Sequence, residues 1–99
     1  MEYILCKLLP PRPTFDRDMN KAEGKVMQEH VGYWARLADK GTAIVFGPVS
    51  DPNGAWGVAI VEVANEADVH AITNGDPVIK SGLGFRYEFY SMPRIIMRK

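Results

Sequence analysis

His30 and Asp76 are the two residues whose types and surroundings in the sequence favour catalysis. His30 lies within the apolar stripe of a predicted helix over residues 20 to 41, beside Trp34 and Leu37, and away from the charged side of that helix. An imidazole that is half buried against a sheet needs a hydrogen-bond partner. A carboxylate in that role would fix the tautomer of the ring and raise its basicity, which suits general acid–base catalysis.

Asp76 is expected at the same end of the fold as His30. It follows a second predicted helix, which ends at Gly75, and it precedes Pro77. If the first helix begins where the first strand ends, and the second helix ends where the last strand begins, the two residues share one end of the sheet. Both also have a purely structural interpretation. His30 would then be a core histidine bound to a backbone carbonyl, and Asp76 a turn residue at a helix end.

Three aromatic residues are candidates for the wall that contacts a substrate, namely Tyr33, Trp34 and Phe46. Aromatic residues at helical spacing are also common in cores, so this interpretation competes with simple packing. Arg12 and Arg17 lie in a proline-rich segment. They would either meet an anionic substrate at the mouth of the site or serve only to solvate a loop.

Motifs for other chemistries are absent. The sequence has no GxGxxG or Walker pattern for phosphates and no GxSxG nucleophile elbow. Cys6, His30 and His70 are too scattered for zinc, so we predict no metal site and no cofactor. Cys6 alternates with apolar neighbours and is expected in the core, and His70 is expected on the surface.

Strand and helix patterns alternate along the chain in the order β-α-β-β-α-β. This order predicts an α+β, ferredoxin-like fold, with a four-stranded antiparallel sheet and two helices on one face. Gly24 weakens the start of the first helix, which would then begin only after it. Asn65 is the expected N-cap of the second helix, residues 10 to 19 are expected as a loop, and residues 78 to 84 fit no element clearly. The predicted strands cover residues 2–9, 43–48, 55–63 and part of 85–96, with a turn at 50–54, and the helices cover 20–41 and about 65–74.

Composition narrows the class of protein. The 99 residues fit one domain, 1–99, and the twelve Lys and Arg balance the twelve Asp and Glu. A neutral chain is a poor candidate for binding nucleic acid through phosphates. With no apolar run long enough to cross a membrane, no signal peptide and a single cysteine, the sequence predicts a cytoplasmic protein.

The first and third predicted strands are apolar on both faces, although helices cover only one face of the sheet. On the third strand Ala59 and Val61 point one way, while Trp56, Val58 and Ile60 point the other. An apolar sheet face of this size is normally covered. We therefore predict a homodimer that forms through the open sheet face.

A set of residues spread from His30 to Tyr90 resembles the YCII-related domain family. The resemblance implies a dimeric α+β barrel of two ferredoxin-like domains, with a pocket whose proposed catalytic His and Asp fall on His30 and Asp76. It also implies that most members have no assigned reaction and that one branch removes chloride from a chlorinated hydroxyquinol. Residues 10 to 29 form a longer segment before the histidine than is usual. The matching residues are His30, Tyr33, Leu37, Gly41, Gly47-Pro48, Gly54, Asp76-Pro77, Gly82-Leu83 and Tyr87-Glu88.

These observations predict a small cofactor-free enzyme, or an enzyme-like protein, acting on a small organic molecule. His30 would be the general base or acid and Asp76 its orienting partner, in an elimination or isomerisation. Two alternatives stay open. One is a module that binds or senses a small ligand without catalysis, and the other is a cofactor-free monooxygenase of the dimeric α+β barrel type.

Overall fold

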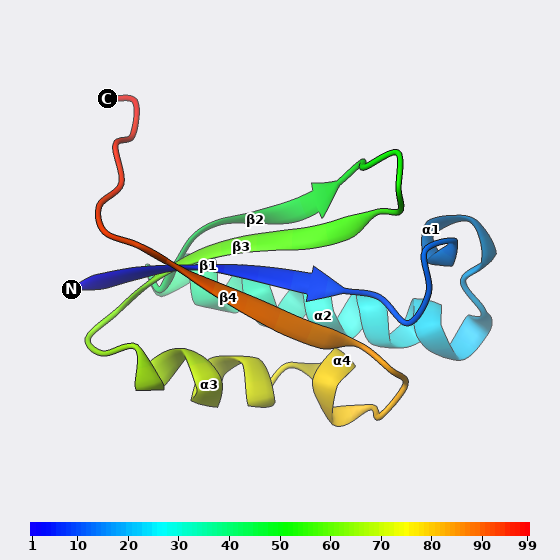
Figure 1. The fold of residues 1–99 in the computed structure, drawn as a ribbon. Helices are drawn as coiled ribbons and strands as arrows, with labels where there is room; N and C mark the ends of the chain where they lie inside the picture. The colour runs from blue at the N-terminus through cyan, green and yellow to red at the C-terminus, as the bar shows by residue number, and fades with distance from the viewer.

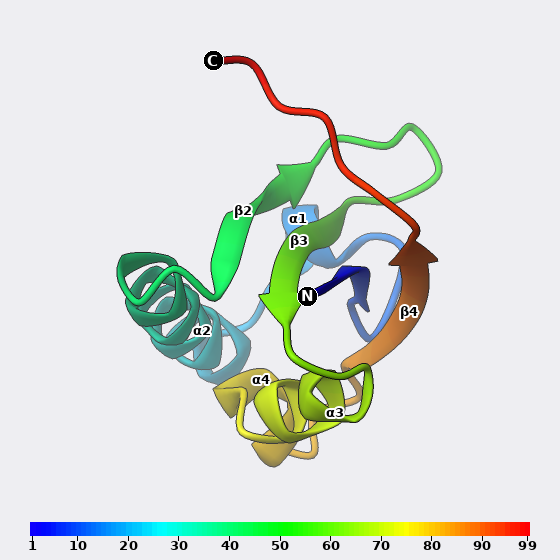
Figure 2. The ribbon, with the colours of Figure 1, turned by 90° about the vertical axis from the view of Figure 1, so that its left-hand side faces the viewer.

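Four antiparallel strands form one sheet in the order β2-β3-β1-β4, which confirms the ferredoxin-like α+β fold (Figure 1). The computed structural model describes residues 1–99. The helices α2, α3 and α4 lie on one side of the curved sheet (Figure 2). The strands are β1 (Glu2–Leu9), β2 (Ala43–Val49), β3 (Trp56–Val63) and β4 (Arg86–Met92), and the helices are α1 (Phe15–Asp18), α2 (Lys21–Asp39), α3 (Ala67–Asn74) and α4 (Pro77–Lys80).

The long helix α2 occupies nearly all of the predicted range. Gly24 does not delay its start, because Asn20 forms a capping box with Glu23. The Asn20 side chain accepts a hydrogen bond from the Glu23 amide at 2.8 Å, and the Glu23 carboxylate accepts one from the Asn20 amide at 2.9 Å. The helix ends before Gly41, whose φ of +85° suits a glycine after a helix C-terminus.

The segment from residue 10 to 19 is more ordered than the predicted loop, and Arg12 is the reason. Its guanidinium donates two hydrogen bonds of 2.8 Å to the Glu23 carboxylate and one of 2.7 Å to Asp18. Hydrogen bonds from Arg12 and from the Asn20 backbone lower the pKa of Glu23 to about 2. These hydrogen bonds hold α1 beside the start of α2 and leave Arg12 paired with two carboxylates.

Two further local predictions need correction. Asn65 is not the N-cap of α3, because the helix begins at Ala67 and Glu66 takes the cap position; Asn65 lies one residue earlier, and its amide donates to the Asp68 carboxylate at 3.2 Å. Part of the ambiguous stretch after Asp76 forms the one-turn helix α4. The Asp76 side chain caps this helix by accepting a hydrogen bond from the Val78 amide at 3.1 Å.

The core lies between the sheet and the helices and has two parts. In each strand alternate residues face the helices, as the period of two requires. A smaller cluster, made by Leu8, Phe15, Val78 and Phe85, joins α1 and α4 to the sheet. The main cluster consists of Ile4, Cys6, Trp34, Leu37, Ala43, Ala59, Val61, Val63 and Val69.

The other face of the sheet carries no helix. Its central strands present Leu5, Val58 and Ile60, all partly exposed, and Tyr90 on β4 is 51% exposed. Charged residues are interspersed there, and the Lys7 ammonium lies 4.7 Å from the centroid of the Trp56 ring. None of the helices of this fold combines the length and apolar character needed to cross a membrane.

Candidate active site

The structure brings the His30 ring and the Asp76 carboxylate together between α2 and the start of α4. His30 Nδ1 lies 2.8 Å from one carboxylate oxygen and 3.0 Å from the other. The His30 side chain keeps 12% exposure and the Asp76 side chain none. An ionised carboxylate can only accept, so in the neutral ring the hydrogen sits on Nδ1. Nε2 is then an unprotonated acceptor.

Three further donors converge on Asp76. Trp34 Nε1 donates to it at 2.8 Å and the Tyr87 hydroxyl at 2.5 Å, in addition to the Val78 amide. Burial by itself raises the pKa of Asp76, but the hydrogen bonds from His30, Tyr87 and Trp34 outweigh it, so the pKa lies below its ordinary value. Asp76 therefore stays ionised and holds the ring without taking its proton.

Each contributing element has a local reason for its position. The capping box fixes where α2 begins, and its helical period places His30 and Trp34 one turn apart on the same face. Tyr87 lies on the helix-facing side of β4, where strand alternation also directs Phe89, and the buried Phe85 directly precedes the strand. Pro77 at the first position of α4 and the capping role of Asp76 fix the turn that carries the carboxylate.

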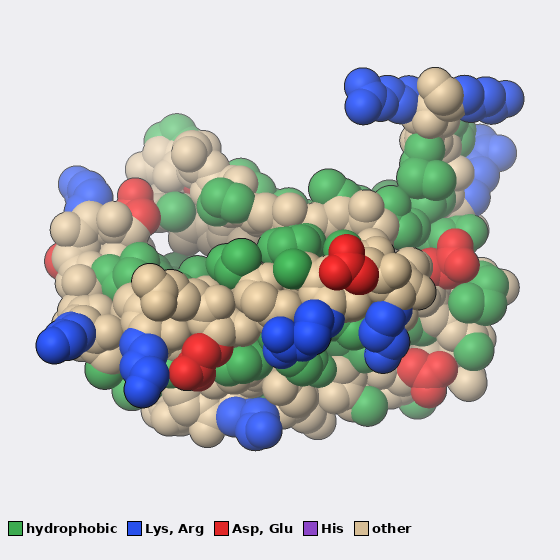
Figure 3. Space-filling view, turned by 180° about the vertical axis from the view of Figure 1, so that it is seen from behind, with side chains coloured by type: hydrophobic (Ala, Val, Ile, Leu, Met, Phe, Trp, Pro, Cys, Tyr) green, Lys and Arg blue, Asp and Glu red, His purple; other side chains and the backbone are tan.

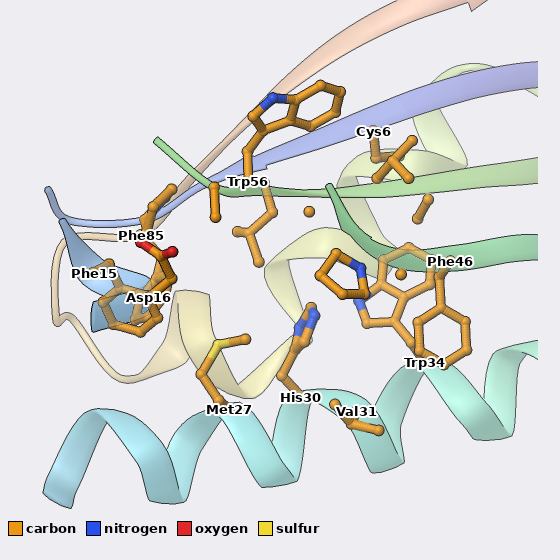
Figure 4. A pocket seen from close by; sticks show the side chains of 18 of the residues that line it. Cys6, Phe15, Asp16, Met27, His30, Val31, Trp34, Phe46, Trp56 and Phe85 are labelled. Carbon is orange, nitrogen blue, oxygen red and sulfur yellow. The ribbon is translucent and has the colours of Figure 1, made fainter. Parts of the chain in front are cut away.

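A cavity of about 250 Å³ opens beside His30, between α2 and the sheet (Figure 4). His30 projects from α2 into this space, with Met27 and Val31 on the same helix, and the Trp56 ring points away to the far side of the strands. Most lining residues are apolar. The volume is slightly below that of most ligand pockets, which measure roughly 300 to 1,000 Å³. The cavity suits one small molecule.

The mouth of the cavity opens on the α2 side of the molecule. There the surface is hollowed between the loop that joins β2 to β3 and the segment that carries α1, and hydrophobic side chains border the hollow (Figure 3). Asp16 and Met19, which follow one another closely in and after α1, both line the cavity. The site thus has one end in the core, at Trp34, and one end at this rim.

A sequence model of the YCII-related domain family matches residues 4–93. The chain belongs to this family. No curated protein matches it. One similar solved structure is a 5-chloro-2-hydroxyhydroquinone dehydrochlorinase from Burkholderia phenoliruptrix AC1100, in complex with 2,5-dihydroxybenzoquinone. It is 20% identical over 88% of this chain and 90% of that chain, with a TM-score of 0.61, and this similarity supports the fold.

The predicted aromatic wall is only partly present in this YCII-related domain. Trp34 and Phe46 line the cavity, with ring centroids 6.4 Å apart. Tyr33 does not line it, because its hydroxyl donates to the Ile72 carbonyl at 2.7 Å and the ring packs toward α3. A Cβ on Gly75 would lie 2.6 Å from that hydroxyl. Tyr33 therefore packs against the turn before Asp76, outside the lining of this cavity.

The sequence did not indicate two features of the site, the contact of Tyr87 with Asp76 and the place of Cys6 in the cavity wall. Tyr87 is among the residues that resemble the family, but nothing in the sequence indicated its hydrogen bond to Asp76. Cys6 is a core residue, as expected, and it also lines the cavity. Burial raises the pKa of its thiol to about 12, so it stays protonated.

The remaining candidates lie apart from the cavity. His70 is on the surface, as expected, and its ring packs edge-on against Phe89 with centroids 4.9 Å apart. Neither Arg12 nor Arg17 lines the cavity. No three His, Cys, Asp or Glu side chains come together in a way that could hold a metal ion.

Proposed function

We propose that this YCII-related domain is a small enzyme that moves a proton on a small organic substrate, with His30 as general base or acid and Asp76 as its orienting partner. The observation that carries the proposal is that the two nitrogens of the His30 ring have different partners. Nδ1 is engaged by a buried carboxylate, so Nε2 is left for a ligand in the cavity that His30 lines. A base positioned in this way typically contributes about 10²–10⁴-fold to a rate.

The reaction that fits this geometry is an elimination or an isomerisation. Nε2 takes a proton from a C–H or O–H of the substrate, and the electron pair left behind forms a new double bond. In an elimination a leaving group departs with its bonding electrons, and in an isomerisation Nε2 returns the proton to a different atom. The imidazolium formed in between is stabilised by the Asp76 carboxylate at 2.8 Å.

The similar dehydrochlorinase supports the choice of test compounds, because its name describes loss of chloride from a chlorinated hydroxyhydroquinone. Proton transfer is measurable even where the full reaction is unknown, since a carbon acid exchanges its hydrogens with D₂O. A panel of chlorinated and unchlorinated hydroxyhydroquinones and cyclic diketones covers both reaction types.

We expect the protein to exchange C–H hydrogens of at least one panel member with D₂O more than about 100-fold faster than the same concentration of free imidazole. The physical reason is that the apolar cavity holds the substrate next to His30 and the Asp76 carboxylate orients the ring. Free imidazole in solution has neither advantage. Proton NMR of the panel during incubation measures the rate. Ligand-induced shifts in the protein with exchange no faster than in imidazole would instead indicate a binding module and contradict the proposal.

We further propose that the domain forms a homodimer through the open sheet face. Leu5, Val58 and Ile60 on its central strands support this, because a stable interface buries about 800 Å² per partner with an apolar centre. Sedimentation equilibrium at micromolar concentration should give twice 11.1 kDa. Ile60→Glu should give the monomer, while Leu83→Glu, in a loop off the sheet, should not. A native protein that sediments at 11.1 kDa would contradict the dimer.

A further inference from the structure

Taking His30 as the proton-transfer group, we infer that the cavity selects ligands that are uncharged where they are buried, that it rejects carboxylates and phosphates, and that Asp16 at the rim sets this preference. The inference deepens the proposed function by naming a substrate class. It starts from the charges that the cavity wall does and does not carry.

No Lys or Arg side chain lines the cavity. The ionisable groups of the wall are Cys6, Asp16, His30 and Tyr87. Burial keeps the Cys6 thiol protonated, and the Tyr87 hydroxyl donates its hydrogen to Asp76. The only positive charge available to a buried anion is therefore a protonated His30.

An anionic ligand that pairs with a protonated His30 would prevent this residue from acting as a base. A buried anion without a counter-ion is strongly unfavourable, so a carboxylate beside Nε2 would draw a proton onto His30. The ring then has no lone pair left to act as a base. A neutral substrate has no such conflict, since the imidazolium and the substrate anion form together during the reaction.

Two arginines lie in the rim segment, Arg12 before α1 and Arg17 within it, and neither lines the cavity. Arg12, which precedes α1, is held by Asp18 and Glu23 through bonds of 2.7 and 2.8 Å. Its guanidinium is therefore not free to turn toward a ligand without breaking both ion pairs. The long segment before His30 thus supplies no Lys or Arg to the cavity wall.

The same segment places a negative charge there. Phe15 is buried and packs edge-on against Phe85 with ring centroids 5.2 Å apart, which anchors α1 to the sheet. The next residue, Asp16, lies at the rim beside these rings (Figure 4) and takes part in no ion pair. An unpaired carboxylate at a mouth with apolar walls repels anions and attracts cations.

Three phenols that differ only in the charge of their para substituent test the inference. They are 4-ethylphenol, which is neutral, 4-hydroxyphenylacetate, an anion, and tyramine, a cation. Titration at pH 7 and low salt, followed by the NMR signals of the His30 ring, gives each dissociation constant. We expect 4-ethylphenol and tyramine to bind at least tenfold more tightly than 4-hydroxyphenylacetate. Equal affinity for the three phenols, tightest binding of the carboxylate, or no binding of any of them at millimolar concentration would overturn the inference.

Variants of Asp16 separate the rim charge from the rest of the cavity. Asp16→Asn should weaken the binding of tyramine about threefold, strengthen the binding of 4-hydroxyphenylacetate about threefold and leave the affinity for 4-ethylphenol unchanged. These factors are expected for two unit charges roughly 10 Å apart, one on the ligand and one at the rim, in a partly aqueous medium. Asp16→Lys should reverse the order of the two charged phenols. Asp39→Asn, an exposed carboxylate that does not line the cavity, should change none of these values.

The order of the dissociation constants can be measured whether or not the protein catalyses hydrogen exchange. An unchanged order of the charged phenols in Asp16→Lys would overturn the role of Asp16, whatever the exchange rates are. If the native protein does not speed up hydrogen exchange of the panel compounds but binds the three phenols in the predicted order, the proton-transfer function is rejected and the charge selectivity still holds.

Discussion

Replacing His30 by glutamine is expected to lower the exchange of substrate hydrogens with D₂O by about 10²–10⁴-fold while the protein stays folded. Glutamine keeps a donor for the Asp76 carboxylate, so the hydrogen bond now made by Nδ1 at 2.8 Å can be replaced. It has no lone pair of comparable basicity to offer a substrate. The exchange rate measures the loss of the base, and thermal melting checks the fold.

The other histidine of the chain is the matched control. His70 is exposed and contacts Phe89, so His70→Gln removes an imidazole that does not line the cavity. Its exchange rate should equal that of the native protein. Equal loss in both variants, or full activity in His30→Gln, would show that His30 is not the base.

Asp76→Asn is expected to weaken both activity and stability. Whichever way the amide turns, its NH₂ group faces a buried N–H, either that of Trp34 or that of Val78. An unsatisfied buried donor costs about 1–3 kcal/mol, which in a domain of this size lowers Tm by roughly 10 °C. The imidazolium also loses its counter-charge, so the exchange rate should fall about 10²-fold or more.

The stability effect of Asp76→Asn should depend on pH in a defined direction. The pKa of Asp76 is below its ordinary value, so its ionised form stabilises the fold above the unfolded-state pKa of about 3.9, and this stabilisation is lost as pH falls through the folded-state pKa. The difference in Tm between native protein and variant should therefore shrink in acid. Asp68→Asn, an exposed carboxylate that accepts one backbone N–H, is the control and should shift stability by less than about 0.5 kcal/mol. A Tm difference that is constant from neutral pH to pH 2 would contradict this account of Asp76.

This expectation differs from the one that the sequence suggests for Asp76. An Asp-Pro turn after a helix is ordinarily exposed, and an exposed turn tolerates asparagine with little loss. The structure buries Asp76 completely and surrounds it with donors from α2, α4 and β4. Asp76 therefore has a structural role as the cap of α4, and its contact with His30 is what the proposed function adds to that role.

Sequence alone determined the order of the elements, because hydrophobic periodicity and turn residues are local properties. The short runs of aliphatic and aromatic residues at 2–9 and 55–63, bounded by turn residues, and the apolar stripe of the helix predicted over 20–41 are sufficient to predict a βαββαβ fold. That fold in turn predicts that His30 and Asp76 lie at one end of the sheet, although they are 46 positions apart in the sequence. Topology brings the two residues together without any knowledge of side-chain packing.

Tertiary packing decided which side chains serve the cavity. An apolar helical stripe is about 100° wide, so its two edges face different neighbours. Trp34 faces the sheet and the cavity, while Tyr33, one residue away, faces α3 and bonds the Ile72 carbonyl. Helical period cannot separate these two environments, because it depends on where α3 lies and not on α2 itself.

The same reason applies to the polar contacts of the site. The bonds from Trp34 and Tyr87 to Asp76 join residues 42 and 11 positions apart, and the position of Asp16 at the rim depends on Phe15 packing against Phe85. Each of these is a long-range contact whose geometry is set only when the strands and helices are assembled. The sequence therefore supplied the catalytic candidates, and the folded structure supplied their partners, the cavity and its charge.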